Sequence, residues 1–163
     1  MSSINIPPAS TETNNYFSLL DSKIQYVRIL VPHDGSEMSD RALRHAVYLS
    51  KVSGAEIVIL HVLEHIENIF QKTKRKGSPM TEEGIRQMLE ERIKLCKKAG
   101  VKELSYIIRA GGPADEIASL VGQEYYDLIV MASSRVSSTI GIILGSNAKR
   151  VIDSVGKPIL VIR

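Results

Sequence analysis

The chain has 163 residues, of which 44% are hydrophobic, 5% aromatic and 24% charged, as expected for one globular domain with a substantial core. A formal net charge of +3 is too small to indicate nucleic-acid binding without a concentrated basic patch. The single cysteine, Cys96, excludes an internal disulfide and fits a reducing compartment. No apolar run approaches the roughly 18 to 20 residues that span a bilayer.

The N-terminal residues are rich in Ser, Thr, Asn and Pro. We predict that residues 1–25 form a flexible tail and that residues 26–163 form the domain. The tail lacks the basic and long apolar regions of a secretory signal. It contains a small apolar cluster, Tyr16, Phe17, Leu19 and Leu20. This cluster predicts either a short segment docked on the domain or an arm that binds a partner or bridges subunits.

After the tail, short β-branched runs alternate with stretches whose apolar residues recur at helical spacing. The predicted strands cover residues 26–32, 55–63, 103–110, 127–132 and 158–162. The predicted helices cover residues 37–53, 82–99, 113–124 and 146–154. In the first helix, Ser36 is the expected N-cap and Gly54 the expected stop. Five strands alternating with four helices predict an α/β fold, a Rossmann-like open parallel five-stranded sheet with helices on both faces.

The carboxyl ends of parallel strands share one edge of the sheet, where ligands bind near the switch in strand order. Pro32 and Asp34 follow the first strand, Val62 ends the second, and Ser133 follows the fourth. The Asp34 carboxylate either accepts hydrogen bonds from ribose hydroxyls or forms an Asx-turn that fixes the corner; spacing alone favours neither. His33 is interpreted as a rim residue, because no partner lies at a catalytic or metal-ligand spacing.

The segment from Val130 to the C-terminus keeps one half of a phosphate-binding loop. Gly145 and Ser146 stand at the start of the last helix, with Ser146 as the expected cap. Unpaired N–H groups and the positive end of the helix dipole make such a start a natural seat for phosphate. A loop that wraps phosphates usually needs Gly where the backbone approaches them. Here those approach positions are Ala132 and Arg135.

Taken together, several segments resemble the universal stress protein family in the same order. These segments are "ILVPHDGSEMSDRALRHA", "IVILHV", "AGGPADEIASLV", "DLIVMA", "LGSNAKRVI" and "KPILVIR". The resemblance implies strand order 3-2-1-4-5 and a cytoplasmic, stress-responsive regulator or binding module. It also implies a homodimer formed through the last strand. Some members of the family bind ATP and others do not.

The resemblance also assigns roles in an adenine-nucleotide site for ATP or AMP. It implies that Asp34 holds the ribose, the Val62 backbone meets the adenine edge, and Gly145 with Ser146 holds phosphate. Pro32, Ser133 and Asn147 complete the expected set. Two glycines of the ATP-binding motif are replaced, by Ala132 and Arg135. Ala132 is tolerable if its φ stays negative, whereas Arg135 either blocks the phosphate path or replaces the lost contacts with its guanidinium.

Three further features leave alternatives open. Hydroxyl residues after the fourth strand, Ser133, Ser134, Ser137, Ser138 and Thr139, suggest either phosphorylation or the small polar residues of a loop. The basic run Lys72–Lys76 is either a solvated loop or a landing site for an acidic partner. The alternative function is a weak ATP-hydrolysing or nucleotide-metabolising enzyme. No catalytic or metal-ligating residues are predicted, and neither a membrane nor nucleic acid is an expected partner.

One other fold assignment fails on its chemistry. A phosphorelay receiver domain shares the five-strand architecture but needs an acceptor Asp at the end of the third strand. This chain has Arg109 and Ala110 there. Neither side chain can carry an acyl phosphate.

Overall fold

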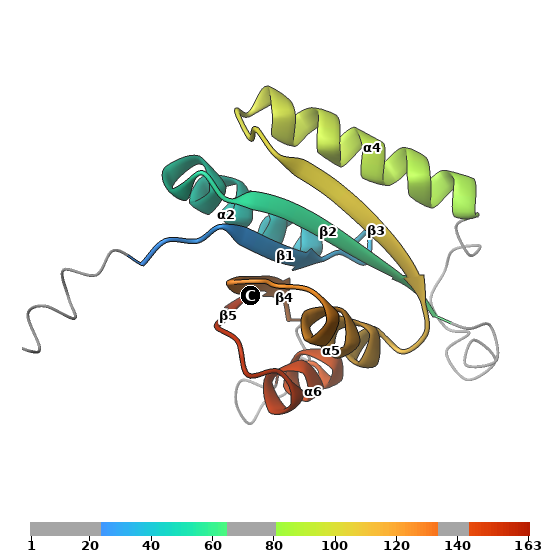
Figure 1. The fold of residues 1–163 in the computed structure, drawn as a ribbon. Coiled ribbons are helices and arrows are strands. Elements are labelled where there is room, and N and C mark those ends of the chain that lie inside the picture. Colours follow the sequence, from blue (N-terminus) through green and yellow to red (C-terminus); the bar gives the residue numbers. More distant parts are fainter. Residues whose placement is uncertain (1–23, 65–80, 134–143) are drawn as a thin grey trace, which may run out of the picture.

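The computed structural model describes residues 24–64, 81–133 and 144–163. Its five strands form one parallel sheet in the order β3-β2-β1-β4-β5 (Figure 1). The strands are β1 Arg28–Pro32, β2 Glu56–Leu63, β3 Leu104–Ala110, β4 Leu128–Ala132 and β5 Ile159–Ile162. The α/β prediction and the strand order implied by the resemblance are both confirmed.

Four helices cover the two faces of the sheet. They are α2 Glu37–Ser53, α4 Glu82–Lys98, α5 Pro113–Gln123 and α6 Ser146–Ser154. Helices α2 and α4 lie on one face, and α5 and α6 lie on the other (Figure 1). Successive strand residues point to opposite faces, so Ile57 and Ile59 of β2 pack toward α2 and α4 whereas Val58 and Leu60 pack toward α5 and α6. Each face therefore has its own apolar core.

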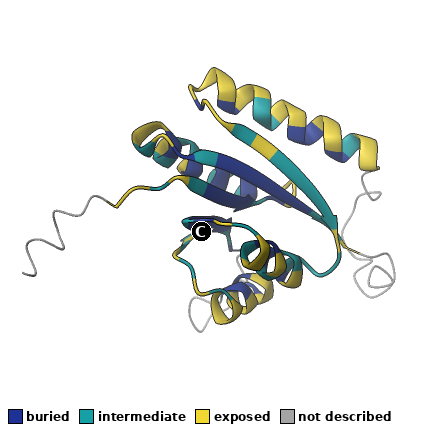
Figure 2. Ribbon diagram, viewed as in Figure 1, coloured by how far each residue is buried: buried dark blue, intermediate teal, exposed yellow. Residues whose placement is uncertain are grey.

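Burial is deepest along the central strands (Figure 2). Residues Ile29 to Val31 of β1 and Leu128 to Met131 of β4 are buried, as expected for strands covered by helices on both sides. The outer strands β3 and β5 carry mostly half-buried residues. The rigid centre of the sheet thus sets the position of the loops at its carboxyl edge.

Local signals set the ends of α2 where the sequence predicts them. The Ser36 Oγ accepts a hydrogen bond from the Ser39 N–H at 3.2 Å, which satisfies one of the unpaired groups at the helix start. Gly54 closes the helix with φ +81°, a left-handed conformation that glycine adopts without a steric penalty. The sequence prediction for this helix is confirmed at both ends.

Two predicted features fall outside the described part of the chain. Residues 1–23 of the predicted tail and the basic run Lys72–Lys76 lie in ranges that the structure does not describe. Among the helices of the described ranges, none combines the length and apolar character that crossing a bilayer requires.

Candidate functional site

The strand ends bring three of the predicted site residues to the carboxyl edge of the sheet. Asp34 follows β1 by two residues, Val62 lies near the end of β2, and Ser133 directly follows β4. Strand β1 lies between β2 and β4, and its last pair with β2 joins Pro32 to Leu60. Because the strand order reverses between β1 and β4, these strand ends flank the switch point where open α/β sheets bind ligands.

A buried hydrogen bond joins the end of β4 to the start of α6. The side chain of Ser133 is buried, with 3% of the residue exposed, and its Oγ accepts the Gly145 N–H at 3.1 Å. The Ser133 N–H in turn donates to the Ile162 carbonyl of β5 at 2.9 Å. The two ends of the segment between β4 and α6 are therefore held together directly.

The expectation that Ser146 caps this helix is wrong. Gly145 is the N-cap residue, with φ −57° and ψ 149°, and Ser146 is already the first residue of α6. A residue with helical backbone angles cannot place its hydroxyl in the cap position. No side chain of the described residues caps α6, and its first turn carries no acidic residue.

The first turn of α6 is accessible to a ligand. Gly145 is buried, but Ser146 and Asn147 are exposed. The N–H groups of a first helical turn have no partner within the helix, and the helix dipole places partial positive charge there. This arrangement fits an anion such as phosphate.

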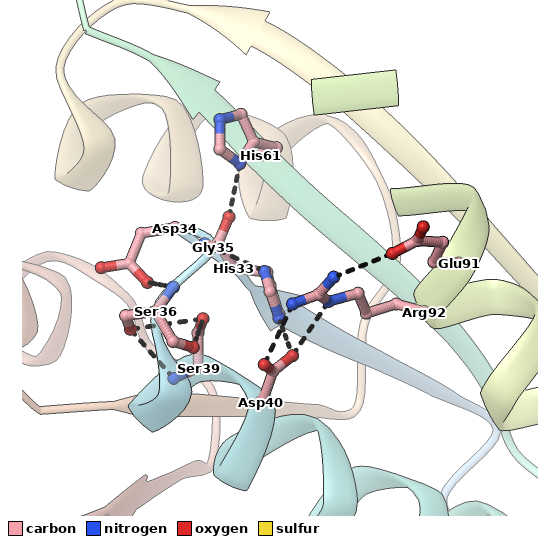
Figure 3. A network of polar contacts seen from close by, with 9 residues as sticks. All are labelled: His33, Asp34, Gly35, Ser36, Ser39, Asp40, His61, Glu91 and Arg92. Atoms are coloured by element: carbon pink, nitrogen blue, oxygen red, sulfur yellow. Dashed lines mark hydrogen bonds and ion pairs between the residues drawn. The ribbon is translucent and has the colours of Figure 1, made fainter. Parts of the chain in front are cut away.

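Asp34 forms an Asx-turn, which is one of the two roles that the sequence left open. Its Oδ1 accepts the Ser36 N–H at 3.0 Å, which is an Asx-turn. Gly35, between them, has φ +83°. The other oxygen, Oδ2, points away from this turn (Figure 3), and the residue is exposed. The Asx-turn therefore leaves one carboxylate oxygen for a ligand hydroxyl.

Hydrogen bonding keeps Asp34 ionised. Burial of the carboxylate would raise its pKa, but hydrogen bonds from Ser36 and Ser39 outweigh that effect and hold the pKa below its ordinary value. An ionised carboxylate is an acceptor only, which is the chemistry that a ribose diol requires.

The methyl group of Ala132 points away from α6. The side chain packs against the core under α2 and α4, on the opposite face of the sheet. No described residue other than glycine has a positive φ, so the condition under which Ala132 can replace glycine is met. Arg135 lies outside the described residues, as do Ser134, Ser137, Ser138 and Thr139.

The corner after β1 contains a buried polar network that the sequence did not predict (Figure 3). The His33 Nδ1 accepts the Gly35 N–H at 3.1 Å, so the proton lies on Nε2, which donates to Asp40 Oδ1 at 2.9 Å. Arg92 of α4 holds the same carboxylate with two hydrogen bonds of 3.1 Å, from Nε and Nη2. His61 donates from Nδ1 to the His33 carbonyl oxygen at 2.7 Å.

This network makes His33 a structural residue. Burial lowers the pKa of His33, and the hydrogen bond to Asp40 opposes that effect only in part. Burial also acts to raise the pKa of Asp40, but the bonds from Arg92 and His33 leave it below its ordinary value. The result is a neutral imidazole and an ionised carboxylate that together fix the turn carrying Asp34.

Both the sequence and the fold of this chain are similar to those of known proteins. A sequence model of the universal stress protein family matches residues 25–163 of this chain. The chain belongs to the universal stress protein family. A universal stress protein of Methanocaldococcus jannaschii is 32% identical over 143 residues, covering 85% of this chain and 82% of the relative.

Solved universal stress proteins share the fold. The structure of a second universal stress protein from Methanocaldococcus jannaschii matches with a TM-score of 0.66 at 31% identity, covering 85% of this chain and 96% of that one. The universal stress protein of Archaeoglobus fulgidus in complex with dAMP matches with a TM-score of 0.59 at 21% identity, covering 86% and 100% of the two chains.

Proposed function

We propose that this universal stress protein is a cytoplasmic binding module for an adenine nucleotide, held at the carboxyl edge between β1 and β4. One observation carries the proposal: Asp34, Val62 and Ser133 lie at the carboxyl ends of the adjacent strands β1, β2 and β4, and Ser133 is bonded to the start of an uncapped helix. Sugar-binding and phosphate-binding groups thus meet at one edge.

Different parts of the proposed site contact the ribose, the adenine and the phosphates. The free oxygen of Asp34 accepts from the ribose, and the backbone of Val62, which is half-buried at the end of β2, meets the adenine edge. Gly145, Ser146 and Asn147 present the helix start to the phosphates, and Pro32 closes the site beside β1. The Archaeoglobus fulgidus structure holds dAMP in a protein of this fold, which supports the choice of an adenine nucleotide.

Binding is favoured over hydrolysis. Among the described residues, the first turn of α2 beside this corner carries two carboxylates, Glu37 and Asp40. Both oxygens of Asp40 are engaged by Arg92, one of them also by His33. An acid that is already held in this way does not serve as a general base for water.

Calorimetric titration with ATP, AMP and adenosine tests the proposal. Asp34→Ala should weaken all three ligands by about 1 to 3 kcal/mol, because each contains the ribose diol that loses a charged acceptor. Asp34→Asn is the matched control, since it keeps an oxygen for the Asx-turn. Glu37→Ala removes a neighbouring carboxylate and should leave the Kd unchanged. An unaltered Kd for Asp34→Ala would leave Asp34 as a corner residue only.

Arg135 needs a separate test, because the sequence supports two opposite roles. We favour obstruction of the usual triphosphate position, since two glycines are missing from the same loop. Arg135→Gly should then tighten ATP binding by restoring the approach of the backbone. Weaker binding of ATP by this variant, with adenosine unaffected, would instead assign the guanidinium as a phosphate ligand.

We also propose that the protein is a homodimer in which β5 pairs with its counterpart. This strand is the outer strand beside β4, and Leu160 within it is 37% exposed. An apolar edge of this kind recruits another strand. Light scattering should give twice the chain mass of 18.0 kDa. Leu160→Lys should shift the equilibrium toward monomer, and a wild-type monomer mass at all concentrations would contradict the proposal.

A further inference from the structure

A concave surface lies between α2 and α4, on the face of the sheet opposite α6. It encloses about 520 Å³. One end is polar, where Arg92 bridges the two helices through Asp40. Apart from Glu37 and Arg44, the rest of the lining is apolar. We name this surface the α2–α4 groove; its lining residues are Glu37, Asp40, Leu43, Arg44, Val47, Arg92, Leu95, Cys96 and Ala99.

The α2–α4 groove leaves apolar side chains without a cover among the described residues. Leu95 lies on its wall with 65% of its surface exposed, and neighbouring Cys96 and Leu43 are buried beneath it. Covering a large aliphatic side chain such as Leu95 removes apolar surface from water, which is favourable. A covering segment would therefore be stabilised by an apolar surface that already exists.

The chain enters the domain near the end of the groove that Val47 and Ala99 line, which we name its open end. Helices α2 and α4 run opposite to the strands, so both end at the edge of the sheet where β1 begins (Figure 1). Tyr26, just before β1, packs against the core under α2 and α4. Ile24, the first described residue, is 82% exposed. The described chain therefore begins near the face of the sheet that carries the groove.

We propose that the apolar residues 16–20 of this chain, Tyr-Phe-Ser-Leu-Leu, occupy the α2–α4 groove. Five residues separate Leu20 from Tyr26, which allows a reach of about 20 Å. The groove follows α2 from Glu37 to Val47, a length of about 15 Å. The segment can therefore reach the groove, and a short tether makes its effective concentration about millimolar.

Charge at the open end favours the same occupant. The last turn of α2 carries Lys51, and the last turn of α4 carries Lys97 and Lys98. All three residues are exposed. Asp21 follows the apolar segment directly, so docking brings an acid toward these basic residues. The basic end of the groove lies at the opposite edge of the sheet from the proposed nucleotide site, whereas Glu37 and Asp40 of its polar end lie near the corner that carries Asp34.

The only cysteine of the chain reports on the groove. Cys96 lines it and is 4% exposed, so a docked segment should protect its thiol from a neutral alkylating reagent. The double variant Phe17→Ser/Leu20→Ser should raise the alkylation rate at least about tenfold, since the loss of either apolar contact alone shifts docking by about that factor. The matched control is Ile4→Ser/Ile6→Ser, in the same polar tail but outside the cluster. Equal rates in all three proteins would overturn the proposal.

A substitution in the groove, followed by protease cleavage of the tail, is a second test of docking. Leu95→Glu alters an exposed residue and should preserve the fold, but it places a charge in the groove. Chymotryptic cleavage after Tyr16 and Phe17 should then become severalfold faster. Val52→Glu, which alters a residue of α2 that is 72% exposed and outside the groove, should have no such effect. Equal cleavage of the two variants would contradict docking.

Concentration distinguishes the chain's own segment from that of a second copy. Docking within one chain gives alkylation and cleavage rates that do not depend on protein concentration. Rates that fall as the protein is concentrated would overturn the proposal in favour of an arm exchanged between copies.

Discussion

The starts of α2 and α6 differ although both helices follow a strand at the same edge of the sheet. At α2, the Ser36 side chain caps the helix and Glu37 and Asp40 place negative charge in its first turn. At α6, Gly145 offers no side chain, and the first turn has no acid. The corner after β1 therefore satisfies its own backbone groups, whereas the first turn of α6 has no side-chain cap, as the proposed phosphate site requires.

The two remaining described helices carry acidic residues in their first turns, as α2 does and α6 does not. Helix α4 is capped by Thr81 and begins with two glutamates. Helix α5 lacks a capping side chain but has Asp115 and Glu116 in its first turn. Negative charge at a helix start stabilises the helix and repels an anionic ligand. Within the described residues, α6 is thus the helix whose start is suited to phosphate.

The largest expected effect concerns the network that fixes the corner after β1. Asp40→Ala removes the acceptor of the buried His33 Nε2–H and of both Arg92 hydrogen bonds, and leaves Arg92 only its ion pair with Glu91 among the described contacts. We expect a loss of about 2 kcal/mol in the free energy of unfolding, measured by urea denaturation. Asp153→Ala, at an exposed position of α6, is the control and should change stability by no more than about 0.5 kcal/mol. Equal effects of the two variants would mean that the network does not stabilise the fold.

An acidic residue in the first turn of α6, like those in α2, should stabilise the protein but weaken its binding of ATP. Asn147→Asp adds a negative charge to the exposed first turn, which should stabilise the helix slightly. The same charge should weaken ATP binding about tenfold and leave adenosine unaffected, because it repels only the phosphates. Lys94→Gln changes the net charge equally on α4 and serves as the control in the same titrations. Undiminished ATP binding by Asn147→Asp would remove α6 from the phosphate site.

Two matched serine substitutions compare the helix starts directly. Ser36→Ala removes a cap and should cost about 1 kcal/mol of folding free energy. Ser146→Ala removes a hydroxyl that does not cap and should cost less than about 0.5 kcal/mol. Thermal unfolding of both variants checks the difference. A larger loss for Ser146→Ala would show that this hydroxyl does cap α6 in solution.

The smallest expected effect is the pH dependence of the corner after β1. The pKa of His33 in the folded protein lies below its ordinary value of 6.5, so the unfolded chain binds the proton more readily. The contribution of neutral His33 is then complete above about pH 6.5 and is lost as the pH falls through the folded pKa. Urea unfolding at several pH values should show stability declining below pH 6.5, and His33→Gln should reduce that slope. An identical slope in the variant would assign the decline to other groups.

Local signals in the sequence predict most of the fold. The helix ends at Ser36 and Gly54 follow from the chemistry of neighbouring residues, and the apolar runs predict the buried strands. The polar network does not follow in this way, because Asp40 and Arg92 are 52 residues apart and nothing in either segment specifies the other. His33 looked like a rim residue for the same reason, since its burial depends on α4 packing beside α2.

Part of the geometry around the candidate site follows from the sequence. A parallel sheet requires its strand ends to share an edge, so the placement of Asp34, Val62 and Ser133 at one edge could be anticipated. The assignment of Ser146 as a cap is wrong by one residue, because the sequence does not show whether a helix begins at Ser146 or after it. That one residue decides which side chain stands at the cap position. The direction of the Ala132 methyl group also depends on register, since successive strand residues face opposite sides.

The uneven pairing of the strands has a consequence for hydrogen exchange. Strands β2 and β3 are joined over seven residue pairs and β1 and β2 over five, but β1 and β4 over only two, at Ile29 and Leu30. The register pairing of β1 with β4 is therefore the shortest in the described sheet. A small molecule that touches the ends of both strands should stabilise that pairing and slow the exchange of its amides when the native protein opens.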